Sequence, residues 1–230
     1  MPKRKPLVIF GSAEIAALAK YYFDLDSDYR VVAFTVDDEF VKSESFEGLP
    51  LVPFSEVATV CPPDDHEMFV GLSYQKLNQL RETKYTQARA AGYRLASYVC
   101  SRAVTWPDLA IGDNGFVLEN QTIQPMVKIG NDVMIWSGNH IGHGSAIGDH
   151  TYIASHVVIS GHCRIGKRCF LGVNATVRDF CTIGDDCFIA MDASVTRDVE
   201  AGSVVLGQSG KVLAPDDRRA RAIKRSFFRL

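Results

Sequence analysis

The fold is decided by residues 129–153, IGNDVMIWSGNHIGHGSAIGDHTYI, in which an isoleucine stands at every sixth position. The series continues without a slip from Ile111 to Val195, with valine or leucine replacing isoleucine at a few steps. A helix repeats every 3.6 residues and a two-sided strand every 2, so neither explains a period of six over this length. A six-residue period is typical of a solenoid built from short strands.

A second, slimmer inward position follows each of these aliphatic residues by four places, and through most of the series it holds a small residue. One branched and one small inward side chain per unit fit a narrow prism, in which three six-residue sides close one coil. Glycine often follows the aliphatic residue, as at Gly112, Gly130 and Gly142, where we expect a corner that a side chain would crowd. The sequence therefore predicts a left-handed parallel β-helix from Ile111 to Leu206, with roughly five coils.

The chain of 230 residues is long enough for two modest domains, and the six-residue period is absent before Ile111. We expect an N-terminal domain over residues 1–103, the β-helix over 104–206, and a basic C-terminal cap or tail over 207–230. The net charge of −2 gives no reason to expect a nucleic acid or an acidic membrane as partner. No apolar run approaches the length of a membrane span, and no cleavage site follows the basic start, so we expect a cytoplasmic protein.

The cysteines of the repeat are expected to fill its core. Cys163 and Cys181 are 18 residues apart, as are Cys169 and Cys187, which stacks each pair in the small inward column. This spacing favours core packing over a metal clip or a disulfide framework.

Five of the six histidines also fall in the repeat, at His140, His143, His150, His156 and His162. Neighbours on one side of a three-sided coil must differ by 18 residues, and no two of these do. The spacing therefore argues against a zinc triad within one chain, although ligands from two subunits could still meet.

Before the repeat, strand and helix patterns alternate. We expect strands at 7–10, 30–36, 51–53, 68–72 and 93–99, and helices at 15–23, from 55 onward, and at 74–91. This alternation predicts a small Rossmann-like parallel sheet of the α/β class.

The first strand leads through Gly11, Ser12 and Ala13 directly into a helix. Free backbone N–H groups and the positive end of the helix dipole at such a turn can bind a phosphate. Only the first glycine of a GxGxxG pattern is present, so a purely structural turn is the alternative.

Carboxylates follow the second strand at Asp37 and Asp38, where the crevice of a doubly wound sheet receives a ribose or base. A solvated acidic turn is the alternative for this pair. Asn78 and Arg81 are three residues apart and share one face of the helix expected over 74–91.

A small α/β domain followed by an unbroken hexapeptide helix resembles the bacterial sugar acyltransferases, which include sialic acid O-acetyltransferases and UDP-amino-sugar N-acetyltransferases. The segments that carry the resemblance are GSAEIA at 11–16, VDD at 36–38, GLSYQKLNQLR at 71–81 and IWSGNHIGHGSAIGD at 135–149. The resemblance implies a homotrimer, acetyl-CoA as co-substrate in a groove between neighbouring β-helices, and a nucleotide sugar held by the N-terminal domain. From the spacing of the histidines we expect no metal.

The same resemblance assigns the site residues. The general base is His143, and imidazole suits this task because it titrates near neutrality. Members of the family often carry an acid or a second histidine after the base, where this chain has Gly144. The nucleotide-sugar site is expected to comprise Gly11, Ser12, Ala13, Asp37, Asp38, Gly71, Tyr74, Asn78, Arg81, Trp136 and His140. The acetyl-CoA site is expected to comprise Tyr152, Gly161, Gly172 and Lys211, the last within GQSGK in place of the family's usual GxPAK.

The leading hypothesis is transfer of an acetyl group from acetyl-CoA to the amino group of a nucleotide-linked deoxyamino sugar in glycan biosynthesis. The first alternative is O-acetylation of a sugar hydroxyl. The others are a hexapeptide zinc enzyme of the carbonic anhydrase kind and a non-enzymatic trimerising scaffold.

Overall fold

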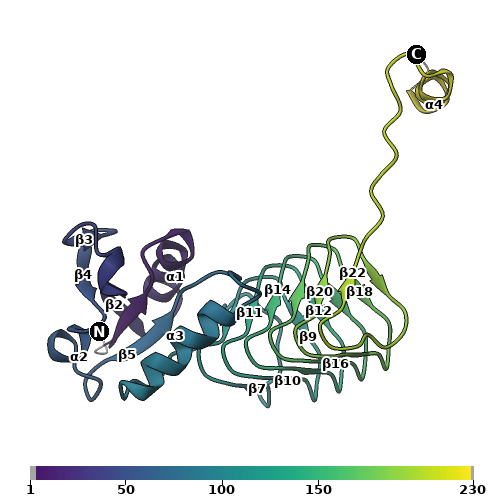
Figure 1. The fold of residues 1–230 in the computed structure, drawn as a ribbon. Coiled ribbons are helices and arrows are strands. Elements are labelled where there is room, and N and C mark those ends of the chain that lie inside the picture. The colour runs from purple at the N-terminus through teal and green to yellow at the C-terminus, as the bar shows by residue number, and fades with distance from the viewer. Residues whose placement is uncertain (1–3, 229–230) are drawn as a thin grey trace.

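The computed structural model describes residues 4–228, and its N-terminal part is a five-stranded sheet in the order β3-β4-β2-β1-β5 (Figure 1). The pairs β1–β2, β1–β5 and β2–β4 are parallel, and the short edge strand β3 is antiparallel to β4. The elements are β1 (Lys5–Phe10), α1 (Glu14–Leu25), β2 (Tyr29–Val36), the 3-10 turn η1 (Asp38–Phe40), β3 (Ser45–Phe46), β4 (Leu49–Pro53), α2 (Val57–Val60), β5 (Glu67–Val70) and α3 (Gln79–Ala90).

Both faces of this sheet are covered, which explains its continuous apolar strands. Leu7 and Ile9 of β1 pack with α1 on the face toward the β-helix, and Val8 packs with α2 and α3 on the other face. All three side chains are fully buried. The predicted small parallel α/β sheet is confirmed.

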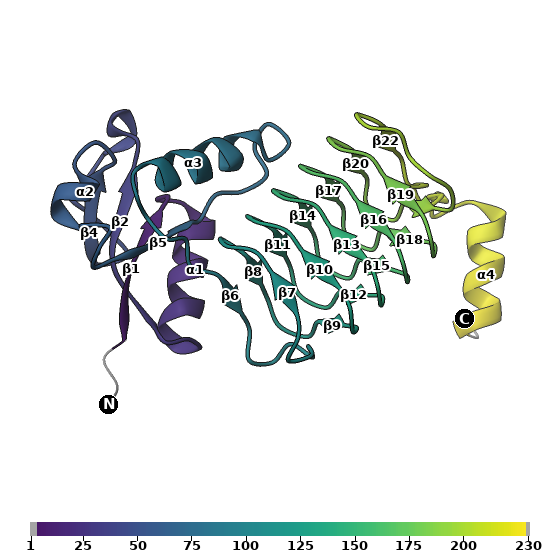
Figure 2. The ribbon, with the colours of Figure 1, turned by 90° about the horizontal axis from the view of Figure 1, so that it is seen from below.

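The second part of the chain is the predicted left-handed β-helix, in which two-residue strands recur every six residues (Figure 2). Parallel pairs join residues 18 apart, such as Ile135 and Ile153, so three sheets form the sides of a prism. The inward aliphatic residues of successive coils form one continuous buried core. The strands are β6 (Tyr98–Val99), β7 (Ala110–Ile111), β8 (Phe116–Val117), β9 (Thr122–Ile123), β10 (Lys128–Ile129), β11 (Met134–Ile135), β12 (His140–Ile141), β13 (Ala146–Ile147), β14 (Tyr152–Ile153), β15 (Val158–Ile159), β16 (Arg164–Ile165), β17 (Phe170–Leu171), β18 (Thr176–Val177), β19 (Thr182–Ile183), β20 (Phe188–Ile189), β21 (Ser194–Val195) and β22 (Val204–Val205).

The corners of the coil differ in detail from the expected glycine corners. Left-handed backbone occurs at the third residue after each inward aliphatic from Ile111 to Ile189, for example φ 55° at Asp132 and 62° at His150. Asparagine, aspartate and histidine tolerate this conformation better than most residues do. The glycines directly after the aliphatic residues are required for another reason: a Cβ on Gly148 would lie 2.6 Å from the carbonyl carbon of Gly166 in the next coil.

Two boundaries differ from the expectations. The strand expected over 93–99 is divided between the two parts of the chain: Leu95 forms a parallel bridge with Met68 of β5, whereas Tyr98 and Val99 pair with β8 of the β-helix. The β-helix therefore begins before the expected boundary at 103/104.

Helix α3 begins at Gln79 rather than 74, because Lys76, Leu77 and Asn78 all have left-handed backbone, with φ of 52°, 51° and 66°.

An aromatic cluster joins the two parts of the chain. Phe23 of α1 lies 5.2 Å from Phe69 of β5 between ring centroids, and Phe69 lies 5.2 Å from Phe116 of the β-helix. Tyr98 completes the cluster, 5.5 Å from Phe23. These rings belong to one buried core that runs from the N-terminal sheet to the first coils, so the two parts form a single packed unit.

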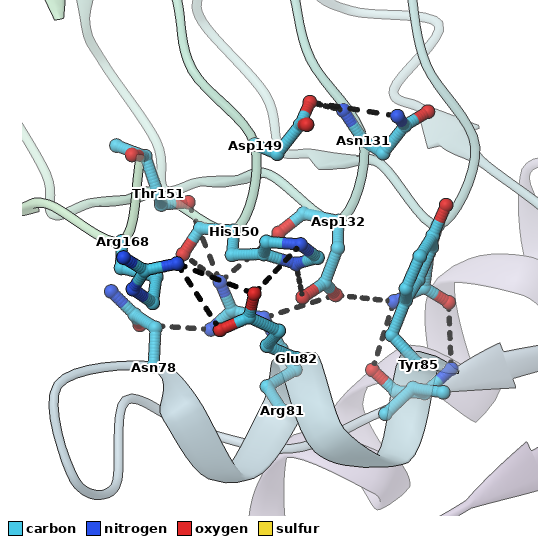
Figure 3. A network of polar contacts seen from close by, with 12 residues as sticks. Asn78, Arg81, Glu82, Tyr85, Asn131, Asp132, Asp149, His150, Thr151 and Arg168 are labelled. Carbon is cyan, nitrogen blue, oxygen red and sulfur yellow. Dashed lines mark hydrogen bonds and ion pairs between the residues drawn. The ribbon is translucent and has the colours of Figure 1, made fainter. Parts of the chain in front are cut away.

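Helix α3 is fastened to the β-helix by Arg81, whose side chain is fully buried (Figure 3). Its Nε donates to Oδ1 of Asp132 at 3.1 Å, and Nη2 donates to the backbone oxygens of Asp132 at 3.0 Å and His150 at 2.9 Å. Asn78 accepts from Nη1 of Arg81 and donates to the backbone oxygen of Cys169. Because the charge of Arg81 is buried, it is tolerated only through this full set of acceptors.

A second layer of the same contact lies nearer to solvent (Figure 3). Oε1 of Glu82 lies 3.3 Å from Nη1 of Arg168. The Nε and Nη2 atoms of Arg168 donate to Asp186, one coil farther along. The hydroxyl of Tyr85 donates to Asp113. Its burial and the bond to Asp113 raise the pKa of Tyr85 to about 12. Polar contacts therefore tie α3 to successive coils.

Asp26 fixes the point where the chain enters the β-helix. Its Oδ2 accepts from the backbone N–H of Ser101 at 2.9 Å and from the hydroxyl of Tyr98 at 2.7 Å. Hydrogen bonds from Ser101 and Tyr98 lower the pKa of Asp26 to about 2. The stabilisation from the ionised carboxylate is therefore present above about pH 4 and is lost as the pH falls toward 2.

We expect Asp26→Ala to lower the free energy of unfolding by about 1–3 kcal/mol at pH 7, because bonds to a charged acceptor are lost. The deficit relative to the native chain should be smaller at pH 3. Urea unfolding of both proteins at the two pH values measures it. An equal deficit at both values would contradict the assignment of the stabilisation to the carboxylate.

At its C-terminal end the chain leaves the prism and ends in α4 (Arg218–Phe228), a basic helix well separated from the coils (Figure 1). The tail expected over 207–230 thus contains a helix within the described residues. All six cysteines are buried and free, which confirms that those in the repeat fill its core. Within residues 4–228, no helix is long and apolar enough to cross a membrane.

Candidate functional site

A pocket of about 410 Å³ lies where the carboxyl ends of β1 and β5 meet the first coils of the β-helix. The start of α1 forms one wall, the segment after β5 a second, and an outward face of the β-helix a third. Its lining includes five of the predicted site residues: Ala13, Gly71, Tyr74, Trp136 and Tyr152. The structure thus gathers residues that are up to 139 positions apart in the sequence, from Ala13 to Tyr152.

A glycine turn at the end of β1 adjoins this pocket, although Gly11 itself is not among the lining residues. Gly11 has a φ of 130°, and a Cβ on it would lie 2.8 Å from the backbone oxygen of Gly71, so the close approach of the two strand ends requires glycine. Ala13 is the N-cap of α1 and offers no capping side chain. The first N–H groups of the helix are therefore left to a ligand or to water. Ser12 lies between these two residues and does not line the pocket.

Aromatic side chains form the wall on the β-helix side. Tyr152 stacks on Phe170 at 5.3 Å with an interplanar angle of 8°, and Tyr74 meets both rings edge to face. Trp136 lies 6.3 Å from Tyr152, and among the described residues its buried indole N–H has no hydrogen-bond acceptor. Burial raises the pKa of Tyr152 well above its usual range, so its hydroxyl is neutral at pH 7. The wall thus combines apolar rings with a donor that lacks a partner.

The carboxylates predicted for the nucleotide lie outside this lining. Asp37 is at the end of β2, as expected, and forms an ion pair with Nζ of Lys84 at 2.6 Å. Asp38 accepts from the hydroxyl of Ser55 at 2.7 Å and from its backbone N–H at 3.2 Å, and these bonds lower the pKa of Asp38. Both carboxylates are already engaged by the protein.

The expectation that Asn78 and Arg81 contact the nucleotide is wrong. Both side chains are fully buried and face the coils of the β-helix, where their polar atoms are taken up by Asp132, His150 and Cys169. Asn78 and Arg81 do lie on one face, as predicted, but this face packs against the β-helix and holds α3 to it.

His143 lies at a corner of the coil between β12 and β13, and its side chain is exposed, as its position in the repeat predicts. Oε1 of Gln124 is 3.0 Å from its Nδ1. Gly161 lies in the next coil directly beside the ring, and a Cβ there would be 2.8 Å from Cε1 of His143. The sequence analysis did not identify Gln124. The 18-residue coil could have pointed to it, because position 125, the next residue after Gln124, lies beside position 143 in the preceding coil.

The remaining predicted residues are spread along the β-helix. His140 is half-buried on β12, between Thr122 and Val158 of the adjacent coils. Gly172 packs against the next coil, where a Cβ would lie 2.5 Å from the backbone nitrogen of Met191. Lys211 is exposed in the segment between β22 and α4. Tyr152, which is expected at acetyl-CoA, lines the pocket between the two parts of the chain.

The histidines of the repeat are dispersed over the corners. Nδ1 of His150 donates to Oδ2 of Asp132 at 2.8 Å, His156 lies beside Gly138 of the preceding coil, and His162 lies beside Gly144 of the preceding coil. Within residues 4–228, no three His, Cys, Asp or Glu side chains are grouped so that they could hold a metal ion.

Comparison with known proteins gives a match to one protein family in sequence and matches to several solved structures in fold. Residues 126–161 and 162–197 match the family of bacterial transferase hexapeptide repeats (six repeats). The acetyltransferase domain of PglB from Neisseria gonorrhoeae FA1090, solved with acetyl coenzyme A, is similar over 91% of this chain and 100% of that chain, with a TM-score of 0.78 and 20% identity. This chain shares its fold.

Two further solved structures agree. PerB from Caulobacter crescentus, solved with CoA and GDP-perosamine, has a TM-score of 0.79 and 23% identity over 91% of this chain and 97% of that chain. WeeI from Acinetobacter baumannii AYE has a TM-score of 0.74 and 19% identity over 90% and 99%. No curated protein gives a match. The likeness extends over both parts of the chain, the N-terminal sheet as well as the coils.

Proposed function

We propose that the protein is a cytoplasmic acetyl-CoA-dependent acyltransferase that acetylates the amino group of a nucleotide-linked deoxyamino sugar. The observation that carries the proposal is the pocket between the N-terminal sheet and the β-helix, lined by Ala13, Gly71, Tyr74, Trp136 and Tyr152. Backbone N–H groups at the start of α1 suit a phosphate. The aromatic wall and the unpaired indole N–H suit a sugar or base that is apolar on one face and polar at its edge.

Acyl transfer requires a base near the acceptor amine, and His143 is the candidate. Within one chain the base and the pocket lie at different corners of the coil, because β12 separates Trp136 from His143. We therefore propose a homotrimer in which the pocket of one subunit faces His143 of its neighbour. A groove between subunits would hold acetyl-CoA along the coils, close to Gly161 and Gly172, with Lys211 near its phosphates.

The choice of an amino sugar rests on the likeness to PerB, which was solved with CoA and GDP-perosamine. The assay follows thiol release from acetyl-CoA with a panel of nucleotide amino sugars and their hydroxyl counterparts. We expect release with an amino sugar and an N-acetylated product by mass. Release with hydroxyl sugars alone would reassign the reaction to O-acetylation, and release with no acceptor in the panel would contradict the proposal.

Filling the pocket should block the acceptor alone. Ala13→Trp places a large ring at an exposed N-cap whose extended backbone accepts any residue, so the fold should be retained. We expect the KM for the nucleotide sugar to rise at least about tenfold, with the KM for acetyl-CoA unchanged. The same change at Ala90, an exposed residue at the end of α3, is the matched control. An unchanged acceptor KM in Ala13→Trp would place the acceptor elsewhere.

A further inference from the structure

A single side chain from the preceding coil, Gln124, holds the imidazole of His143. Oε1 of Gln124 lies 2.9 Å from the backbone nitrogen of His143 and 3.0 Å from its Nδ1. A backbone N–H can only donate, so the amide atom that faces it must be the oxygen. The same oxygen has no hydrogen to give to the ring. The hydrogen between Gln124 and Nδ1 must therefore belong to His143.

A neutral imidazole carries one N–H, so a hydrogen on Nδ1 leaves the lone pair on Nε2. We propose that Gln124 is the positioning residue of the base: it fixes the tautomer of His143, so that Nε2 is the atom that accepts the proton of the acceptor amine. This inference rests on the proposed acyl transfer and names the atom that performs its proton transfer.

The next coil confines the ring from the other side. A Cβ on Gly161 would lie 2.8 Å from Cε1 and 3.1 Å from Nε2 of His143, so the ring occupies the space that the glycine leaves. The rings of His143 and His162 meet edge to face at 4.8 Å, and His162 in turn stacks on Phe180 at 5.2 Å. Gln124 of the preceding coil and His162 of the next coil lie on either side of the imidazole. The ring can therefore extend only outward from the corner.

Gly144, the residue after the proposed base, has no side chain that could orient the imidazole. Gly144 has a φ of 67°, and a Cβ on it would lie 2.7 Å from Nδ1 of His162. A side chain at this position would therefore meet His162 in the next coil, as Asp132 meets His150 at the corresponding corner. Gln124 orients the imidazole instead, and as a neutral amide it does so without stabilising the imidazolium by charge.

The pH dependence of kcat distinguishes orientation from simple packing. Gln124→Glu keeps an acceptor oxygen and adds a negative charge, which favours the protonated imidazole and raises its pKa. We expect the acidic limb of the kcat profile to move to higher pH by about one unit or more. Gln124→Leu removes the acceptor and should lower kcat at least about tenfold with the KM for acetyl-CoA unchanged. Gln79→Leu, on the exposed start of α3, is the matched control. An unmoved limb in Gln124→Glu would overturn the proposal.

Two further measurements separate this inference from the proposed function. In a His143→Ala background, Gln124→Leu should cause no additional loss, because a positioning residue acts only through the base; an additive loss would overturn the inference. Nitrogen NMR of the imidazole reports the tautomer without any substrate. A hydrogen on Nε2 in the native protein would overturn the inference. A hydrogen on Nδ1 that is lost in Gln124→Leu, in a protein that acetylates nothing, would support the positioning by Gln124 and contradict the proposed function.

Discussion

Replacing His143 by alanine is expected to lower kcat by about two orders of magnitude or more, because general base catalysis contributes typically about 10²–10⁴-fold. The amine must lose a proton as it attacks the thioester, and the exposed imidazole at this corner is the group proposed to take it. The KM for acetyl-CoA should change little, since the imidazole is proposed to act on the acceptor amine rather than to bind acetyl-CoA. Initial rates of thiol release at saturating substrates measure the effect.

His156→Asn is the control for this variant. His156 occupies a comparable exposed corner, and asparagine tolerates its left-handed backbone, with a φ of 60°. It should behave as the native enzyme. A near-native kcat in a correctly assembled His143→Ala protein would move the role of base to another residue, with His140 the next to test.

Replacing Arg81 by alanine is expected to destabilise the protein by about 3–5 kcal/mol, because it removes the guanidinium that is paired with the buried carboxylate of Asp132. The change also removes the donor to the backbone oxygen of His150 and one partner of Asn78. We expect α3 to lose its attachment to the coils while the core of the β-helix stays intact. Urea unfolding followed by circular dichroism measures the loss.

Arg89→Ala, on the same helix, is the matched control. The side chain of Arg89 is 56% exposed and lies 3.6 Å from Asp113, so this surface ion pair contributes at most about 1 kcal/mol. Equal decreases in the free energy of unfolding of the two variants would show that the buried ion pair of Arg81 stabilises the protein no more than the exposed ion pair of Arg89. A stable Arg81→Ala protein would contradict the role of this contact in joining the two parts of the chain.

The coils of the β-helix from Ile111 onward could be predicted because each coil repeats the same two inward positions. Its start was placed too late, although the register of the aliphatic residues extends back from Val117 to Val99, one coil earlier. Thr105, between Val99 and Ile111, interrupts the apolar pattern. The start of α3 could not be predicted, since neither glycine nor proline marks the left-handed backbone at Lys76, Leu77 and Asn78.

The candidate site was only partly predictable, because which face of α3 meets the β-helix depends on tertiary packing. Asn78 and Arg81 have the chemistry of ligand contacts, and periodicity alone does not tell a ligand from a neighbouring coil. The signal that could have settled this was a polar column with the 18-residue period of the coil. Its members are Asn114, Asp132, His150, Arg168 and Asp186, which all take the left-handed corner position. Such a column of polar corners requires a polar partner.

The most direct test of a site shared between subunits mixes two variants. Ala13→Trp blocks the pocket and His143→Ala removes the base, so each alone should be nearly inactive at low acceptor concentration. When the two are unfolded together and reassembled one to one, we expect about a quarter of native activity, since each site draws one residue from each of two neighbours. Mixing without reassembly is the control. Activity no higher than that of the separate variants would contradict the shared site.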